Sequence, residues 1–356
     1  MDDARHTSSA DWPTPAAGGT AVHAPRTRPR QFLVIFAATL ALGMLFLLPG
    51  LKREETHQSL AVHEVTALSA ASGGSLPAGV TAGLPANAET VAITYPEARL
   101  WAGKLLLIDR EHPIPAEAPA PNTFGILRYS TGRLTCRDVT AVTSEETLKA
   151  LDELFAFARR AKINLFTIFA ATRSEEAQRN RQIDRFTVLA GSMSLPDALA
   201  QALKEIPDAA CSEHQQGWCV DIRICDAWNR PPRNEPLSAS EEGRWLLENC
   251  WRFGFLHRWE GTCADPDEAY HFRFVGKAHA AMAHALDVSF EDYLLLLRAQ
   301  GALTLWHEDG TPYVTVLCAE TPRTLTVSMP LHTTTDDVSM DNTGWAAASY
   351  VWEADK

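Results

Sequence analysis

The stretch Ser212–Asp221 (Ser-Glu-His-Gln-Gln-Gly-Trp-Cys-Val-Asp) carries the clearest functional pattern of the chain. His214 and Asp221 are seven positions apart, too far for one helical turn and typical of a loop that enters a strand. Gly217 between them permits a backbone turn that directs both side chains inward. A strand aspartate that is buried without a partner is costly, and a metal ion would satisfy it. The stretch therefore predicts half of a metal site, with a surface loop carrying an incidental histidine and aspartate as the alternative.

A second polar cluster follows at Glu268–Gly276 (Glu-Ala-Tyr-His-Phe-Arg-Phe-Val-Gly). Glu268 and His271 are three positions apart and lead into a predicted strand at His271–Val275. Taken alone, such a pair is common and equally fits two solvated side chains. Together with the first cluster it supplies two imidazoles, one carboxylate ligand and a spare glutamate. These are the ligands of an open tetrahedral Zn²⁺ site, with a base for the water in the fourth position.

Four motifs in this order resemble the VanY type of D-alanyl-D-alanine carboxypeptidases, zinc metallopeptidases related to the hedgehog and lysostaphin zinc folds. The first cluster matches S-x-H-x-x-G-x-x-x-D through Ser212, His214, Gly217 and Asp221, and the second matches E-P-W-H-x-R-Y-V-G over Glu268–Gly276. The other two are a strand end S-G-Y-R-S-x-x-x-Q, matched over Ala170–Gln178, and F-G-F after a helix, matched at Phe253–Phe255. The resemblance covers roughly residues 100–300 and implies hydrolysis of the terminal D-Ala-D-Ala bond of peptidoglycan stem peptides.

The resemblance also implies a role for each matching residue. It makes His214, Asp221 and His271 the zinc ligands, Glu268 the general base, Arg173 the group that binds the peptide and stabilises the oxyanion, and Ser212, Gln178 and Tyr270 substrate contacts. A salt-bridged surface arginine and a polar helix surface stay open as alternatives for Arg173 and Gln178. The chain departs from the family pattern at Ala170–Thr172 and at Ala269–Tyr270, so we expect intact zinc chemistry with an altered substrate preference. Cys219 shares a strand face with Asp221 and would lie near the metal.

The N-terminal region contains an uncharged apolar run, Phe32–Leu48, preceded by Arg26, Arg28 and Arg30. With the apolar residues that follow, it predicts a membrane anchor at 32–51. The basic flank places the N-terminus in the cytoplasm. We therefore expect a single-pass protein of the cell membrane with an extracytoplasmic catalytic domain. A cleaved signal peptide and a buried core helix are the alternatives.

Composition divides the rest of the chain. Residues 1–31 are predicted to be a disordered cytoplasmic tail and 52–98 a flexible linker, because both are polar or rich in small residues without periodicity. An α+β domain, with helices packed on a small antiparallel sheet that carries the zinc site, is expected over 99–301. Short β-type runs predict a β-rich appendage over 302–356. The net charge of −12 gives no basic surface for nucleic acid.

Local signals place the secondary structure of the expected domain. Helices are expected after the capping box Thr143–Glu146 and after Ser174, Ser194, Ser240 and Ser289, and strands at Leu105–Asp109, Ile163–Phe169 and Cys219–Ile224. Of the seven cysteines, some could pair outside the membrane and several are best explained as buried small residues; their pairing does not follow from sequence. Because the motifs fix the metal and not the scissile bond, an L,D-carboxypeptidase, an endopeptidase of the cell wall and a non-catalytic wall-binding module remain alternative functions.

Overall fold

A computed structural model describes residues 76–131, 134–225, 235–258, 268–321 and 323–353. The described residues all belong to one compact unit. The predicted tail and anchor fall outside the described residues. Within the described ranges, no helix has both the length and the apolar composition needed to cross a membrane.

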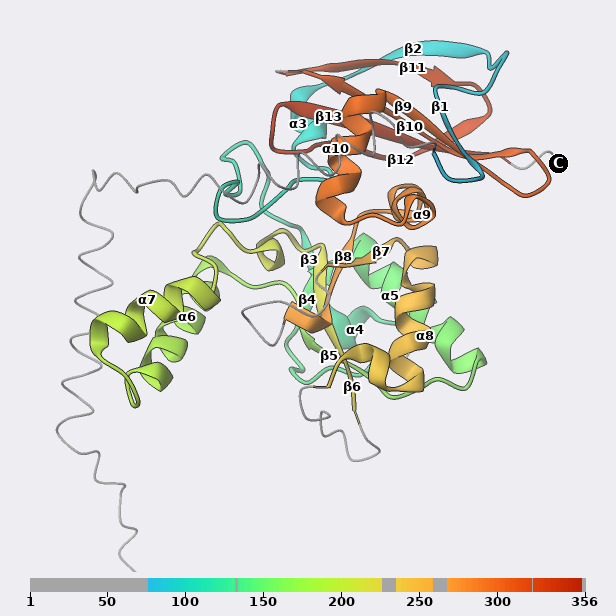
Figure 1. Cartoon of the computed structure of the whole chain (residues 1–356). Coiled ribbons are helices and arrows are strands. Elements are labelled where there is room, and N and C mark those ends of the chain that lie inside the picture. Colours follow the sequence, from blue (N-terminus) through green and yellow to red (C-terminus); the bar gives the residue numbers. More distant parts are fainter. Residues whose placement is uncertain (1–75, 132–133, 226–234, 259–267, 322, 354–356) are drawn as a thin grey trace, which may run out of the picture. The chain divides into compact units, whose positions relative to one another are not determined.

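A four-stranded antiparallel sheet in the order β5-β6-β8-β7 carries the predicted motifs (Figure 1). Its strands are β5 (Phe166–Ala170), β6 (Cys219–Ile224), β7 (Phe255–His257) and β8 (His271–Phe274). Alternation along β6 and β8 places Val220, Ile222 and Phe272 in a hydrophobic core with residues of α5 and α8. The opposite face of both strands is left for polar side chains. The expected strand at Cys219–Ile224 is thus confirmed.

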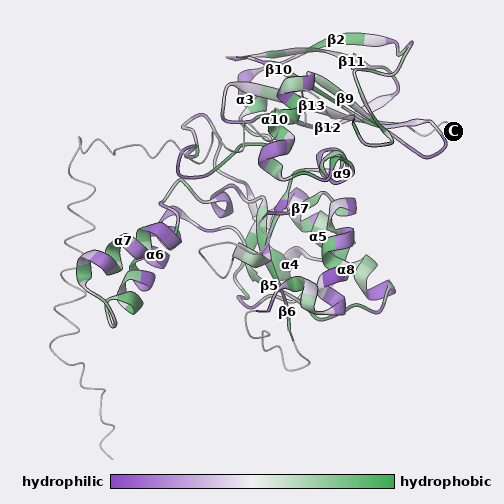
Figure 2. Ribbon diagram, in the orientation of Figure 1, coloured by the Kyte–Doolittle hydropathy of each residue, from purple (hydrophilic) through white to green (hydrophobic). Residues whose placement is uncertain are grey.

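Serine side chains begin five of the helices of this region. The helices are α5 (Glu145–Arg160), α6 (Glu175–Leu189), α7 (Leu195–Glu205), α8 (Glu241–Asn249) and α10 (Phe290–Gln300). In each, the preceding serine accepts a hydrogen bond from the backbone N–H three positions on. For α5 the cap is Ser144 and not the predicted Thr143, because Ser144 Oγ accepts from Thr147 N. Figure 2 shows hydrophilic and hydrophobic residues alternating along α5 and α8, as expected for helices with one apolar face.

The described residues contain further helices and strands. They are β1 (Val80–Ala82), β2 (Thr90–Tyr95), α3 (Glu97–Leu100), β3 (Thr123–Gly125), α4 (Ile126–Tyr129), β4 (Val142–Ser144), α9 (Lys277–Leu286), β9 (Ala302–Trp306), β10 (Pro312–Glu320), β11 (Leu325–Pro330), β12 (Thr333–Met340) and β13 (Trp345–Trp352). Short 3₁₀ helices occur at η1 (Glu213–Gln216), η2 (Leu237–Ala239), η3 (Cys250–Phe253) and η4 (Glu268–Tyr270).

The C-terminal strands are β-rich as expected, but they do not form a separate appendage. They build a five-stranded sheet in the order β1-β9-β10-β13-β12, and its first strand comes from residues 80–82. One hydrophobic core joins this sheet to α9 and α10 through residues such as Met282, Leu297 and Val316 (Figure 1). The expected boundary at residue 302 therefore runs through a shared core.

Two further predictions need correction. Residues 76–98 are not a flexible linker, since β1 pairs with β9 and β2 pairs with β11; residues 52–75 lie outside the described part. No strand forms at Leu105–Asp109, where the backbone instead bonds to β12 and the turn after it through Leu105 N to Ser339 Oγ and Leu107 N to Asp341 O.

Candidate metal centre

The three predicted ligands come together on the polar face of the four-stranded sheet. Asp221 lies on β6 and pairs directly with His271, the first residue of β8. His214 belongs to η1, which Gly217 ends at a φ of 78° before β6 begins. A positive φ is accessible to glycine without steric cost, so Gly217 turns the chain and returns His214 over the start of β6.

The ligand atoms of His214, Asp221 and His271 all lie within 4.8 Å of one another, and all three residues are buried. Asp221 Oδ1 is 3.1 Å from His214 Nε2 and 3.0 Å from His271 Nδ1. The two imidazole rings meet edge to face with centroids 4.7 Å apart. Two nitrogens and one carboxylate oxygen converging on a point are the donor set that an open zinc site uses, so these residues fit the metal.

The other nitrogen of each imidazole has an acceptor of its own. His214 Nδ1 donates to the backbone oxygen of Ala171 at 2.7 Å, and His271 Nε2 donates to Glu213 Oε2 at 2.9 Å. Because each acceptor fixes a proton on its nitrogen, His214 Nε2 and His271 Nδ1 are the atoms that face Asp221 and would coordinate a metal. Metal-binding histidines are oriented in this way by an acceptor behind the ring.

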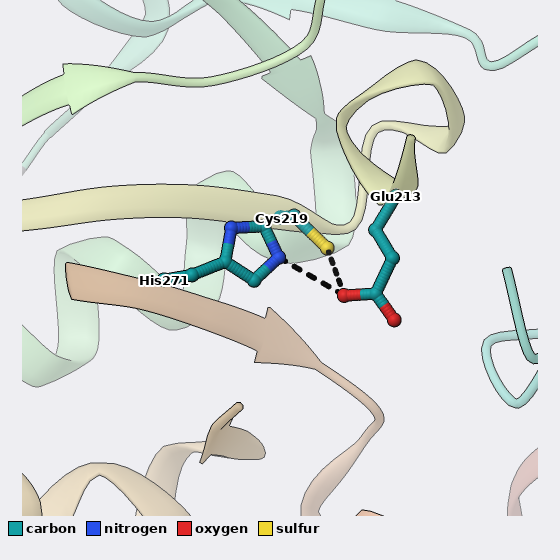
Figure 3. Close-up of side chains that lie close together, drawn as sticks. All are labelled: Glu213, Cys219 and His271. Carbon is teal, nitrogen blue, oxygen red and sulfur yellow. Dashed lines mark hydrogen bonds and ion pairs between the residues drawn. The ribbon is translucent and has the colours of Figure 1, made fainter. Parts of the chain in front are cut away.

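Glu213, Cys219 and His271 form a second cluster of possible ligands behind the first (Figure 3). Cys219 Sγ lies 3.6 Å from Glu213 Oε2, on the Nε2 side of the His271 ring. Glu213 is already bonded to the guanidinium groups of Arg258 and Arg273. Two guanidinium groups at this carboxylate would repel a metal cation, so the first cluster is the better candidate for the metal site. Burial raises the pKa of the Cys219 thiol, which disfavours the thiolate needed for coordination.

Burial and neighbouring charges set the protonation of the cluster. Burial lowers the pKa of His214 to about 4, and the nearby Arg173 guanidinium adds to this effect. Burial alone raises the pKa of Asp221, but His214 and His271 hold it well below its ordinary value. Burial lowers the pKa of His271, but Cys219 and the carboxylates of Asp221 and Glu213 outweigh it and leave the value well above normal. At neutral pH His214 is thus neutral and Asp221 ionised, the forms that bind a metal, whereas His271 must release a proton to coordinate one.

Arg173 and Gln178 lie beside the metal ligands. Arg173 Nη2 is 3.3 Å from Asp221 Oδ2, and its Nη1 is 3.3 Å from Gln178 Oε1. The backbone N–H of Arg173 donates to His214 O, which fixes the arginine to the metal loop. Gln178 is fully buried, so the alternative of a polar helix surface is wrong. Arg173 likewise pairs with a predicted ligand that is buried, Asp221.

The other predicted site residues are placed less directly. Ser212 is buried as the residue before η1. Tyr270 is buried in the core, its hydroxyl donates to Glu235 O, and its ring stacks on Arg223. The backbone of Glu268 begins η4, but its side chain is outside the described part of the structure. Substrate contact by Ser212 and Tyr270 and base catalysis by Glu268 therefore stay predictions.

Sequence reasoning missed the acid behind the metal site. Glu213 is buried, and burial raises its pKa, but Arg258 and Arg273 hold that pKa well below the ordinary value. The available signal was its place: an acid directly before His214 inside the motif. Without the pairing of β6 and β8, nothing in the sequence joined it to His271.

Residues 141–277 match the family model VanY, D-alanyl-D-alanine carboxypeptidase. The three predicted ligands, Glu268 and Arg173 lie within this range.

Two curated relatives are D-alanyl-D-alanine carboxypeptidases of enterococci. The Enterococcus faecium protein is 23% identical over 60% of this chain, which spans 64% of that relative's length. The Enterococcus faecalis protein is 24% identical over 74% of this chain and 90% of its own length. Among solved structures, the vancomycin resistance D,D-dipeptidase VanXYg, in complex with a D-Ala-D-Ala phosphinate analogue, has a TM-score of 0.51 at 17% identity, covering 74% of this chain and 99% of its own. This last likeness supports the fold.

Proposed function

We propose that this chain is a zinc D,D-carboxypeptidase that removes the terminal D-alanine from peptidoglycan stem peptides. The observation that carries the proposal is the buried convergence of His214, Asp221 and His271, with Arg173 on the second oxygen of Asp221. The matches to VanY-type carboxypeptidases support the choice of substrate.

The residues of the site divide the work of hydrolysis. His214, Asp221 and His271 would hold zinc, which supplies a Lewis acid for the scissile carbonyl and lowers the pKa of water. Glu268, three residues before His271, accepts the proton of the attacking water and returns it to the leaving amine nitrogen. Arg173 places a fixed cation at the metal site, where it stabilises the oxygen that gains negative charge.

The same proposal places the enzyme outside the cytoplasm. The apolar segment at 32–51, with its arginine-rich N-terminal flank, supports a single membrane anchor with the catalytic domain on the outer side. There the domain meets its substrate, since peptidoglycan is assembled outside the membrane. This orientation is tested by placing a cysteine on either side of the apolar segment and labelling it in intact and in permeabilised cells.

The reaction is tested on the purified full chain with two synthetic stem peptides. We expect about one zinc per chain and chelator-sensitive release of D-alanine from a pentapeptide that ends in D-Ala-D-Ala. A tetrapeptide that ends in a single D-alanine is the matched control. Cleavage of the tetrapeptide instead would identify an L,D-carboxypeptidase.

The variant Glu268→Gln separates a peptidase from a wall-binding module. In a peptidase it retains zinc and loses turnover, because the amide no longer accepts the proton of water. Unchanged D-alanine release by this variant would refute the role of Glu268. Zinc binding without cleavage of either peptide, by the natural chain, would refute the proposed reaction.

A further inference from the structure

Arg273 is a fully buried arginine two residues after the metal ligand His271, on the same face of β8. Its Nη1 donates to Glu213 Oε1. Its Nη2 donates to the backbone oxygens of Lys104 at 2.8 Å and Leu106 at 2.7 Å. One planar guanidinium therefore ties the carboxylate behind His271 to a backbone segment 167 or more positions away in sequence.

The segment Lys104–Leu106 is itself fixed by the C-terminal sheet. Leu105 N donates to Ser339 Oγ on β12 at 2.8 Å. Asp337, also on β12, accepts from Lys104 N at 3.1 Å and from Lys104 Nζ at 3.0 Å. The two carbonyls that receive Arg273 are therefore positioned by side chains of β12, far from the metal motifs in sequence.

The neighbouring arginine joins the same assembly to α10. Arg258 Nε donates to Glu213, while its Nη1 and Nη2 donate to the two oxygens of Glu291 at 3.0 and 2.8 Å. The ring of Phe290 lies under both guanidiniums, 4.8 Å from that of Arg258 and 4.7 Å from that of Arg273. Glu213 is thus clamped from two sides by groups whose own partners belong to the C-terminal part of the chain.

We propose that Arg273 is a positioning residue through which the C-terminal sheet sets the orientation of the metal ligand His271. The order of contacts runs from Ser339 and Asp337 through the Lys104–Leu106 backbone to Arg273 and then to Glu213. Figure 3 shows the last contact, from Glu213 to His271 Nε2. The inference rests on the proposed function, because it assumes that His271 binds zinc. It gives the β-rich C-terminal region a role in the metal site.

The proposed role of Arg273 requires the planar shape of its guanidinium as well as its positive charge. A lysine keeps the positive charge but presents one nitrogen on a flexible stem, and it cannot span Glu213 and two carbonyls in one plane. The outer acceptor of a metal-binding histidine fixes the ring and raises its basicity, and its loss costs about 10–100-fold in metal affinity. Loosening Glu213 should therefore weaken zinc binding even where the overall charge is kept.

The test compares zinc affinities of the full chain, measured by competition with a chromophoric chelator. Arg273→Lys is expected to bind zinc about 10–100-fold more weakly, and Ser339→Ala to shift in the same direction. The visible spectrum of the Co²⁺-loaded protein should change in both variants, because it reports the geometry of the ligands. Thermal unfolding of the metal-free proteins shows whether each variant folds.

Two control variants alter the same region without touching the path to His271. Arg298→Lys disturbs the bond from α10 to Asp341 Oδ2, and Thr304→Val removes a buried hydroxyl that bonds Gly83 O. Both should retain the natural zinc affinity and Co²⁺ spectrum.

Natural affinity and spectrum in folded Arg273→Lys and Ser339→Ala would overturn the inference, and if Arg273→Lys does not fold, Ser339→Ala decides alone. A natural chain that binds zinc but releases no D-alanine refutes the proposed reaction and leaves this comparison standing.

Discussion

His279 is a buried histidine whose titration should make the fold sensitive to acid. It lies on α9 with no exposed surface, and its Nδ1 is 2.7 Å from the hydroxyl of Tyr293 on α10. Its Nε2 has no hydrogen-bond partner among the described residues. Burial lowers the pKa of His279 from 6.5 to about 4, with Asp337 opposing and Lys104 adding to the shift.

The sign and size of the effect follow from this shift. Between pH 6.5 and 4 the unfolded chain takes up a proton that the folded chain does not, so the free energy of unfolding falls as the pH falls. Protonation weighted over both states gives a loss of about 2 kcal/mol between about pH 7 and pH 4.5 from His279 alone. The penalty for keeping His279 unprotonated in the folded chain is small above pH 6.5 and grows as the pH falls towards 4.

Urea unfolding at pH 7 and pH 4.5 measures this loss, in the natural chain and in His279→Met, with chelator present. The variant should lose about 2 kcal/mol less than the natural chain over this interval. The orphaned Tyr293 hydroxyl costs about 1–3 kcal/mol in the variant at both pH values, and His279→Met combined with Tyr293→Phe controls for it. Other acid-sensitive groups, including His214, cancel in the comparison. Equal losses in the natural chain and the variant would refute the reasoning.

Three substitutions in the metal loop and beside it give further expected outcomes. His214→Ala should abolish stoichiometric zinc binding, measured by metal analysis after dialysis, because two ligands remain. Arg173→Met should retain zinc and lower kcat about 100–1,000-fold with the pentapeptide, as loss of one oxyanion-stabilising group does; an unchanged kcat would contradict its role. Gly217→Ala should lower the free energy of unfolding by about 1–2 kcal/mol in urea, because its φ is 78° and the new Cβ would lie 3.1 Å from Pro121.

The elements that the sequence predicts well depend on signals within a few residues. Serines at 174, 194, 240 and 289 cap the helices that follow them, since each cap is a bond to the third residue onward. The alternation of Cys219–Ile224 defines β6. The motifs also predict which side chains meet, and His214, Asp221 and His271 lie together because β6 and β8, which pair, follow and carry them.

The elements that were missed depend on partners far away in the chain. β2 pairs with β11, and Thr94 Oγ1 meets Thr326 Oγ1 across 232 positions. Residues 76–98 are poor in large apolar side chains, so composition alone resembles a linker, and their strands form only because the C-terminal strands offer an edge. A composition-based boundary cannot detect pairing of this kind.

The same reason explains why the support of the metal site was invisible in the sequence. A buried carboxylate such as Glu213 is stable only with charged partners, and removal of one partner from such a cluster is strongly destabilising. Its partners, Arg258 and Arg273, need acceptors in turn, and they find them at Glu291 and at the Lys104 and Leu106 carbonyls. Each of these partners satisfies a polar group that would otherwise be buried without one. The Lys104–Leu106 segment is in turn bonded to Asp337 and Ser339 on β12. Truncation of the chain before β12 should therefore weaken zinc binding as well as stability, although every metal ligand would remain in the protein.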